Sequence, residues 1–198
     1  MLATTPSDLA PAVLGGVWCP VVSLYKDTAR QEVDLEASYT YFSHLIRGGV
    51  NGLVLQGSTA EAALLSLEER IDLTRTARRA ATDLGVPDFP LAAGVSGQST
   101  NETLKLVEDA AGAGANFGLL LPPSYWPKAI TNDALVDFYR EVADISPIPI
   151  IAYNVWQSTH PLLVLTNSCS SLVLLLASTL ALMCFLKSLR IQTLLVPS

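Results

Sequence analysis

The chain has 198 residues, which is enough for one domain with a sizeable core. Half of the residues are hydrophobic, 15% are charged and the net charge is −6, a balance that argues against nucleic acid or an anionic membrane surface as the main partner. The three cysteines are odd in number and have no metal spacing, which suits a reducing compartment. Neither of the two histidines lies in a metal-binding pattern, and we expect neither a metal nor a cofactor.

Residues 1–14 have neither the basic region of a signal peptide nor the arginines of a transit peptide. We therefore expect a disordered lead there and a cytoplasmic protein, with a mitochondrial location as the alternative.

From Gly15 onward, short apolar runs alternate with helical patterns that carry capping signals. The expected strands are 17–24, 52–56, 89–94, 117–121 and 148–153. The expected helices begin after the caps Asp34, Ser66 (with Glu69), Ser99 (with Glu102) and Thr131 or Asn132. The four arginines of the second helix, Arg70, Arg75, Arg78 and Arg79, are expected to form its solvated face.

Alternating strands and helices of this kind predict a parallel α/β architecture, either a (β/α)8 TIM-type barrel or a doubly wound sheet. The five recognisable βα units end near residue 154, and three more units would need roughly twice the chain that remains. The barrel interpretation therefore predicts an incomplete barrel.

Candidate site residues follow three of the strands. Gly57, Ser58 and Thr59 come directly after the second strand, at the end where ligands sit in parallel α/β folds. Backbone N–H groups and hydroxyls there suit a carboxylate or a phosphate. The alternative is an ordinary turn in which Ser58 or Thr59 caps the next helix.

Two tyrosines stand at corresponding places. Tyr125 lies beside Trp126 in a proline-rich loop after the fourth strand, and Tyr153 ends the fifth strand. Packing is one interpretation of both. A phenol at a strand end can also relay a proton when a hydroxyl lies beside it.

The order of these motifs, G-S-T-x-E, P-P-x-Y and then Y-N, resembles the dihydrodipicolinate synthase and N-acetylneuraminate lyase family of class I pyruvate-type aldolases. Within that family, the segment 142–153 is most similar to 4-hydroxy-2-oxoglutarate aldolases. The resemblance covers Gly15 to Asn154. It implies a (β/α)8 barrel, usually a homotetramer, in which a lysine forms a Schiff base with a small 2-oxo acid.

The resemblance also implies roles for the candidate residues. Thr59 and the neighbouring N–H groups, with Gly57 and Ser58, would hold the substrate carboxylate. Ser58 would link Tyr153 to Tyr125, which reaches into a neighbouring subunit's site in many members. Tyr153 would carry protons as the imine forms and breaks.

The pattern departs from the family after about residue 155. The expected lysine window, 178–183, contains no lysine, and Lys187 is the only lysine beyond Lys128. We therefore expect a partial barrel domain over 15–155 and an atypical hydrophobic segment over 156–198. That tail is an out-of-frame translation, a membrane segment over 161–186, or a divergent part of the barrel.

Two functions follow from these expectations. The resemblance implies a Schiff-base-forming lyase, aldolase or synthase that acts on 4-hydroxy-2-oxoglutarate or a pyruvate aldol. The alternative is a non-catalytic, truncated fragment that lacks the Schiff-base lysine and is membrane-associated through its tail.

Overall fold

The computed structural model describes residues 15–126, 129–154, 172–176 and 193–195. The described residues fall into two compact units. Residues 16–94 and 108–118 make up one, which we call the β1–β3 unit. The other, the β5–β7 unit, contains Gly15, residues 95–107 and the described residues from Leu119 onward. The expected disordered lead, 1–14, lies outside the described residues.

The β1–β3 unit contains three parallel strands in chain order, β1 (Trp18–Pro20), β2 (Gly52–Leu55) and β3 (Leu91–Gly94). Strand β1 is shorter than the expected 17–24. Pro20 is its last residue, one further backbone bond runs from Val21 N–H to Val54 O at 3.0 Å, and the chain then continues into an isolated antiparallel bridge, Tyr25↔Val33.

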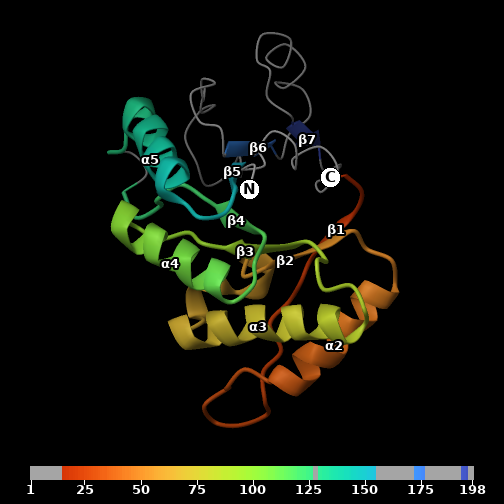
Figure 1. Ribbon diagram of the computed structural model, residues 1–198. Helices are drawn as coiled ribbons and strands as arrows, with labels where there is room; N and C mark the ends of the chain where they lie inside the picture. Colours follow the sequence, from red (N-terminus) through yellow and green to blue (C-terminus); the bar gives the residue numbers. More distant parts are fainter. Residues whose placement is uncertain (1–14, 127–128, 155–171, 177–192, 196–198) are drawn as a thin grey trace. The chain divides into compact units, whose positions relative to one another are not determined.

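Helices α2 (Leu35–Arg47) and α3 (Leu67–Asp83) follow β1 and β2, and they lie side by side (Figure 1). The predicted caps are confirmed. The Asp34 carboxylate accepts the N–H groups of residues 36 and 37, and Ser66 and Glu69 make both bonds of a capping box. Gly49 and Gly85, at φ +85° and +78°, follow the two helix ends in the left-handed conformation that favours glycine.

Apolar side chains from these strands and helices form the core of the β1–β3 unit. Phe42 of α2, Leu53 of β2, Leu73 of α3 and Leu91 of β3 are each at most 3% exposed. Because both faces of the strands carry apolar side chains, the β2 and β3 sequences read as continuous apolar runs, as parallel strands do.

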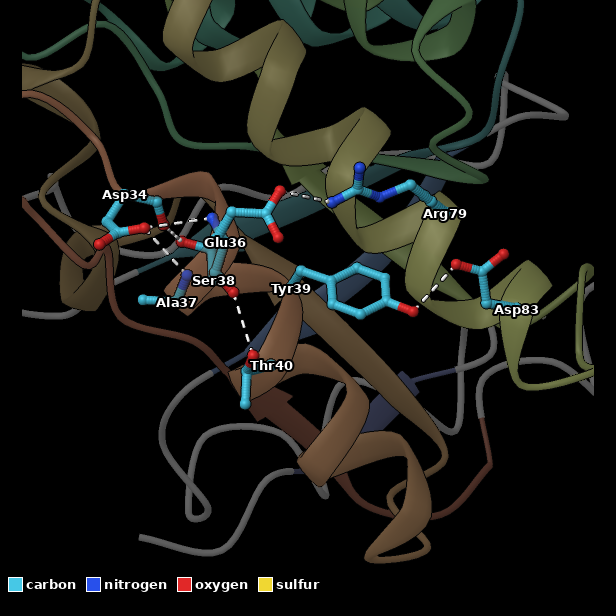
Figure 2. Close-up of polar contacts among 8 residues, drawn as sticks. All are labelled: Asp34, Glu36, Ala37, Ser38, Tyr39, Thr40, Arg79 and Asp83. Atoms are coloured by element: carbon cyan, nitrogen blue, oxygen red, sulfur yellow. Dashed lines mark hydrogen bonds and ion pairs between the residues drawn. The ribbon is translucent and has the colours of Figure 1, made fainter.

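Polar contacts join the outer surfaces of α2 and α3 (Figure 2). The Tyr39 hydroxyl donates to Asp83 Oδ2 at 2.9 Å, and the Arg79 guanidinium lies 4.6 Å from the Tyr39 ring centroid and 3.4 Å from Glu36 Oε1. The hydrogen bond to the Asp83 carboxylate raises the pKa of the Tyr39 phenol, because it stabilises the protonated form. Arg79 therefore lies on the solvated face, as predicted.

Arg78 contradicts that prediction, because its guanidinium is partly buried. It donates to Gly114 O at 3.0 and 2.8 Å, to Phe89 O at 3.0 Å and to Asn116 Oδ1 at 2.7 Å, and it also bonds Pro87 O. Burial lowers the pKa of this guanidinium. The side chain satisfies loop carbonyls at the amino-terminal ends of β3 and β4.

Strand β4 (Phe117–Leu120) is aligned with β3 by backbone bonds on either side of β3. Asn116 N–H donates to Leu91 O at 2.8 Å, and Val95 N–H donates to Leu119 O at 2.9 Å. Helix α4 (Thr100–Gly112) precedes β4, and helix α5 (Asn132–Ile145), capped by Thr131, follows it.

The β5–β7 unit contains a second set of parallel strands, β5 (Ile150–Asn154), β6 (Leu172–Leu176) and β7 (Thr193–Leu195). Strands β6 and β7 lie in the expected atypical tail, and both are parallel to β5, as a continuing barrel segment requires. The rest of the tail, 155–171, 177–192 and 196–198, lies outside the described residues. Within the described ranges, none of the helices combines the length and hydropathy needed to cross a membrane.

Candidate active site

A sharp turn follows β2 and carries the predicted residues Gly57, Ser58 and Thr59. It is bracketed by two non-glycine residues with left-handed backbones, Gln56 at φ +55° and Glu61 at φ +52°. Between them, 58–60 form a single 3₁₀ turn. Left-handed conformations cost non-glycine residues free energy of order 1–3 kcal/mol, so other contacts must hold this turn in place.

Gln56 is held by its side chain and by its backbone. Its side-chain nitrogen, Nε2, donates to Arg70 O at 2.6 Å and to Thr74 Oγ1 at 2.9 Å, both on α3, and the residue is 5% exposed. Its carbonyl oxygen lies where a Cβ at Gly94 would be, 1.9 Å from the ideal position. The end of β3 must therefore be glycine for this backbone to approach.

The turn is also bonded to the chain that leaves β1. Ser23 Oγ donates to Ala60 O at 2.7 Å, and Thr59 Oγ1 donates to Val21 O at 3.3 Å. Because the Thr59 hydroxyl gives its proton to Val21, the Thr59 amide, rather than its side chain, is the donor that remains for a ligand.

Two exposed residues of this turn have donors without a described acceptor. Ser58 and Thr59 are exposed, and over the described part of the chain their amide N–H groups and the Ser58 hydroxyl have no acceptor. Helix α3 is capped by Ser66 instead, so the interpretation of Ser58 or Thr59 as a helix cap is wrong. Two amides and a hydroxyl at a strand end can bind a carboxylate.

Tyr125 and Trp126 belong to the loop after β4, and both are largely exposed, at 72% and 68%. Their rings meet edge to face with centroids 4.6 Å apart. Tyr153 is half-buried in β5, where it is in register with Leu175 of β6.

Ser58 lies in the β1–β3 unit, whereas Tyr125 and Tyr153 lie in the β5–β7 unit. The predicted link through Ser58 between the two tyrosines stays a prediction. Lys128 and Lys187 lie outside the described residues. Among the residues that the structure does describe, no three His, Cys, Asp or Glu side chains gather as a metal site would need.

Sequence reasoning missed two side chains that shape these loops. Ser23 bonds the turn after β2, and Gln98 bonds the loop after β4. Neither lies in a motif. The only signal for each was its place just after a strand, on the loop next to a candidate site.

Parallel βα units in this order are typical of the (β/α)8 class, in which ligands bind at the carboxyl ends of the strands, where the turn after β2 lies. Comparison with known proteins agrees with this class. The profile of the dihydrodipicolinate synthetase family matches residues 14–168, so the chain belongs to that family.

The chain is similar to curated fungal aldolases over 70% of its length. A mitochondrial protein of Coccidioides immitis (strain RS), named as a 4-hydroxy-2-oxoglutarate aldolase, is 43% identical over 139 residues, and the match covers 43% of that protein. An L-threo-3-deoxy-hexylosonate aldolase of Aspergillus niger is 36% identical over 140 residues, which are 42% of its length. The chain therefore spans less than half of the length of the curated relatives that it matches.

Solved structures give the same fold. A dihydrodipicolinate synthase family protein from Coccidioides immitis superposes with a TM-score of 0.77 at 33% identity, covering 91% of this chain and 59% of that one. YagE, a prophage protein of Escherichia coli K12 solved in complex with pyruvate, gives a TM-score of 0.75 at 25% identity and covers 93% of this chain and 64% of its own. The predicted TIM-barrel fold class and the predicted family are confirmed.

Proposed function

We propose that the chain acts as a Schiff-base-forming aldolase or lyase on a small 2-oxo acid, with 4-hydroxy-2-oxoglutarate as the favoured substrate. The observation that carries the proposal is the turn after β2, where the exposed residues Ser58 and Thr59 have two amide N–H groups and the Ser58 hydroxyl without an acceptor among the described residues. These donors would bind the carboxylate that every 2-oxo acid carries. The name of the Coccidioides immitis relative supports the choice of substrate.

The chemistry would require an amine. Attack of a lysine amine on the keto carbon, followed by loss of water, would give a protonated imine that accepts the electron pair of the breaking carbon–carbon bond. Tyr153 would move the protons, through Ser58 and Tyr125. Lys187 is the single lysine after β5, so in this chain it would be the amine.

A second candidate is a protein that binds 2-oxo acids without transforming them. The sequence supports it, because the window 178–183, where the resemblance places the Schiff-base lysine, contains none. In this case the turn after β2 would still bind the carboxylate. The two functions therefore differ in one covalent step.

Borohydride reduction distinguishes them. The full chain is incubated with pyruvate and borohydride, and its intact mass is measured. A Schiff-base enzyme gains the mass of one reduced pyruvate adduct, and the adduct is lost in Lys187→Arg. Acetone, which has the keto group without the carboxylate, serves as the control and should label poorly. An unlabelled chain that still binds pyruvate would establish the non-catalytic candidate.

Location and assembly need their own measurements. The Coccidioides immitis relative is named as mitochondrial, which favours the mitochondrial alternative over a cytoplasmic location for this chain. Cell fractionation would test it, and would also test the membrane-associated tail. The homotetramer that the resemblance implies is tested by light scattering.

A further inference from the structure

The loop that carries Tyr125 is held through side chains of another loop rather than through its own backbone. Leu121 N–H donates to Ser96 Oγ at 2.8 Å, and the N–H groups of Ser124 and Tyr125 both donate to Gln98 Oε1, at 3.0 and 3.1 Å. The two residues between Leu121 and Ser124 are prolines, which have no N–H. Every backbone donor from Leu121 to Tyr125 is therefore bonded to the segment 96–98.

Gln98 is itself fixed at the start of α4. Its N–H donates to Glu102 Oε2 at 2.7 Å, and the N–H of Glu102 donates to Ser99 Oγ at 3.2 Å. In the predicted capping box, the Glu102 carboxylate would accept the N–H of the cap residue, Ser99. Here it accepts the N–H of Gln98, one residue earlier. This displaced bond orients the backbone from which the Gln98 side chain leaves.

We propose that Gln98 is a positioning residue for Tyr125: its side-chain carbonyl fixes the backbone of Ser124 and Tyr125, and so fixes the direction in which the Tyr125 phenol leaves the loop. The inference rests on the proposed function, in which Tyr125 takes part in proton transfer. Tyr125 is 72% exposed and its ring meets that of the neighbouring Trp126 edge to face, so the backbone of this loop segment sets the direction in which the side chain starts.

Exchange of the two amide hydrogens tests the positioning directly, without reference to activity. Gln98→Leu has nearly the size of glutamine but no acceptor, whereas Gln98→Glu keeps an oxygen at the same place. A typical hydrogen bond contributes about 1 kcal/mol. We therefore expect the amides of residues 124 and 125 to exchange about fivefold faster in the leucine variant and at the wild-type rate in the glutamate variant.

A matched control is Asn101→Leu, which places the same apolar side chain on the exposed first turn of α4, where no described contact is lost. It should leave both amides unchanged. Equal exchange in the wild type and Gln98→Leu, or faster exchange in Asn101→Leu as well, would overturn the proposal.

The second readout separates positioning from binding. Because the carboxylate is held at the turn after β2, Gln98→Leu should lower kcat for cleavage of the 2-oxo acid and leave KM nearly unchanged, and Gln98→Glu should restore kcat. Unchanged kcat in the leucine variant would overturn the link to Tyr125. A wild-type chain that forms no imine refutes the proposed function, and hydrogen exchange alone then decides the role of Gln98.

Discussion

Replacing Gly94 with alanine would place a methyl carbon 1.9 Å from the carbonyl oxygen of Gln56. Real Cβ atoms essentially never come nearer than 3.0 Å to such an atom, so the two backbones must separate by more than 1 Å. The oxygen belongs to a residue in the left-handed conformation whose side chain is bonded to α3, and it has little freedom to move.

Two opposing effects set the size of the change. Alanine restricts the unfolded chain, which stabilises a protein by about 0.4–1 kcal/mol where the native backbone accepts it. Overpacking costs about 1–3 kcal/mol, and the cost is greatest where the neighbour is backbone. We expect the clash to prevail, with a net loss of about 2 kcal/mol in the free energy of unfolding.

Urea denaturation measures this loss, which corresponds to a midpoint lower by about 1 M at the slopes usual for small proteins. Gly57→Ala is the matched control from the same turn. Its φ is −84°, and an added Cβ there meets nothing within 4 Å. This variant should be as stable as the wild type or slightly more so. A Gly94→Ala variant as stable as Gly57→Ala would refute the reasoning.

Three further changes test other contacts. The hydrogen bond from the Ser66 N–H lowers the pKa of the Glu69 carboxyl from its ordinary 4.5. The contribution of this carboxylate to stability is therefore complete above pH 4.5 and is lost as the pH falls through the lowered pKa. Urea midpoints of Glu69→Gln should depend less on pH in that acidic range. Arg78→Lys, which cannot bond all the carbonyls that the guanidinium bonds, should lose about 2 kcal/mol in the same assay. Ser23→Ala removes the 2.7 Å bond to Ala60 O, and calorimetry should show severalfold weaker pyruvate binding; unchanged affinity would contradict its role in holding the turn.

The features that the sequence predicted well are those with local causes. Asp34 caps α2 through N–H groups two and three residues away, and the capping box of α3 spans three residues. The strand-end position of Ser58 could also be predicted, because in a parallel sheet all carboxyl ends lie at one edge.

The features that the sequence did not predict depend on distant partners. The left-handed backbone of Gln56 is compatible with the fold because Gly94, 38 residues later, has no side chain. Arg78 looks like one more exposed cation of an amphipathic helix, and the loops before β3 and β4 make it a partly buried donor. The catalytic part of the prediction needs Ser58 and the tyrosines together, and it stays open to the borohydride experiment.

The parallel register of the β1–β3 unit has a consequence for synthesis on the ribosome. Trp18 pairs with Gly52, 34 positions later, and Leu53 pairs with Leu91, 38 positions later. Neither ladder has a hairpin from which to start, so both pairings depend on closing a long connection. The nascent chain therefore carries the apolar β2 segment without a partner strand on its β3 side until residue 91 has left the exit tunnel, and we expect this interval to be the stage of synthesis most prone to misassembly.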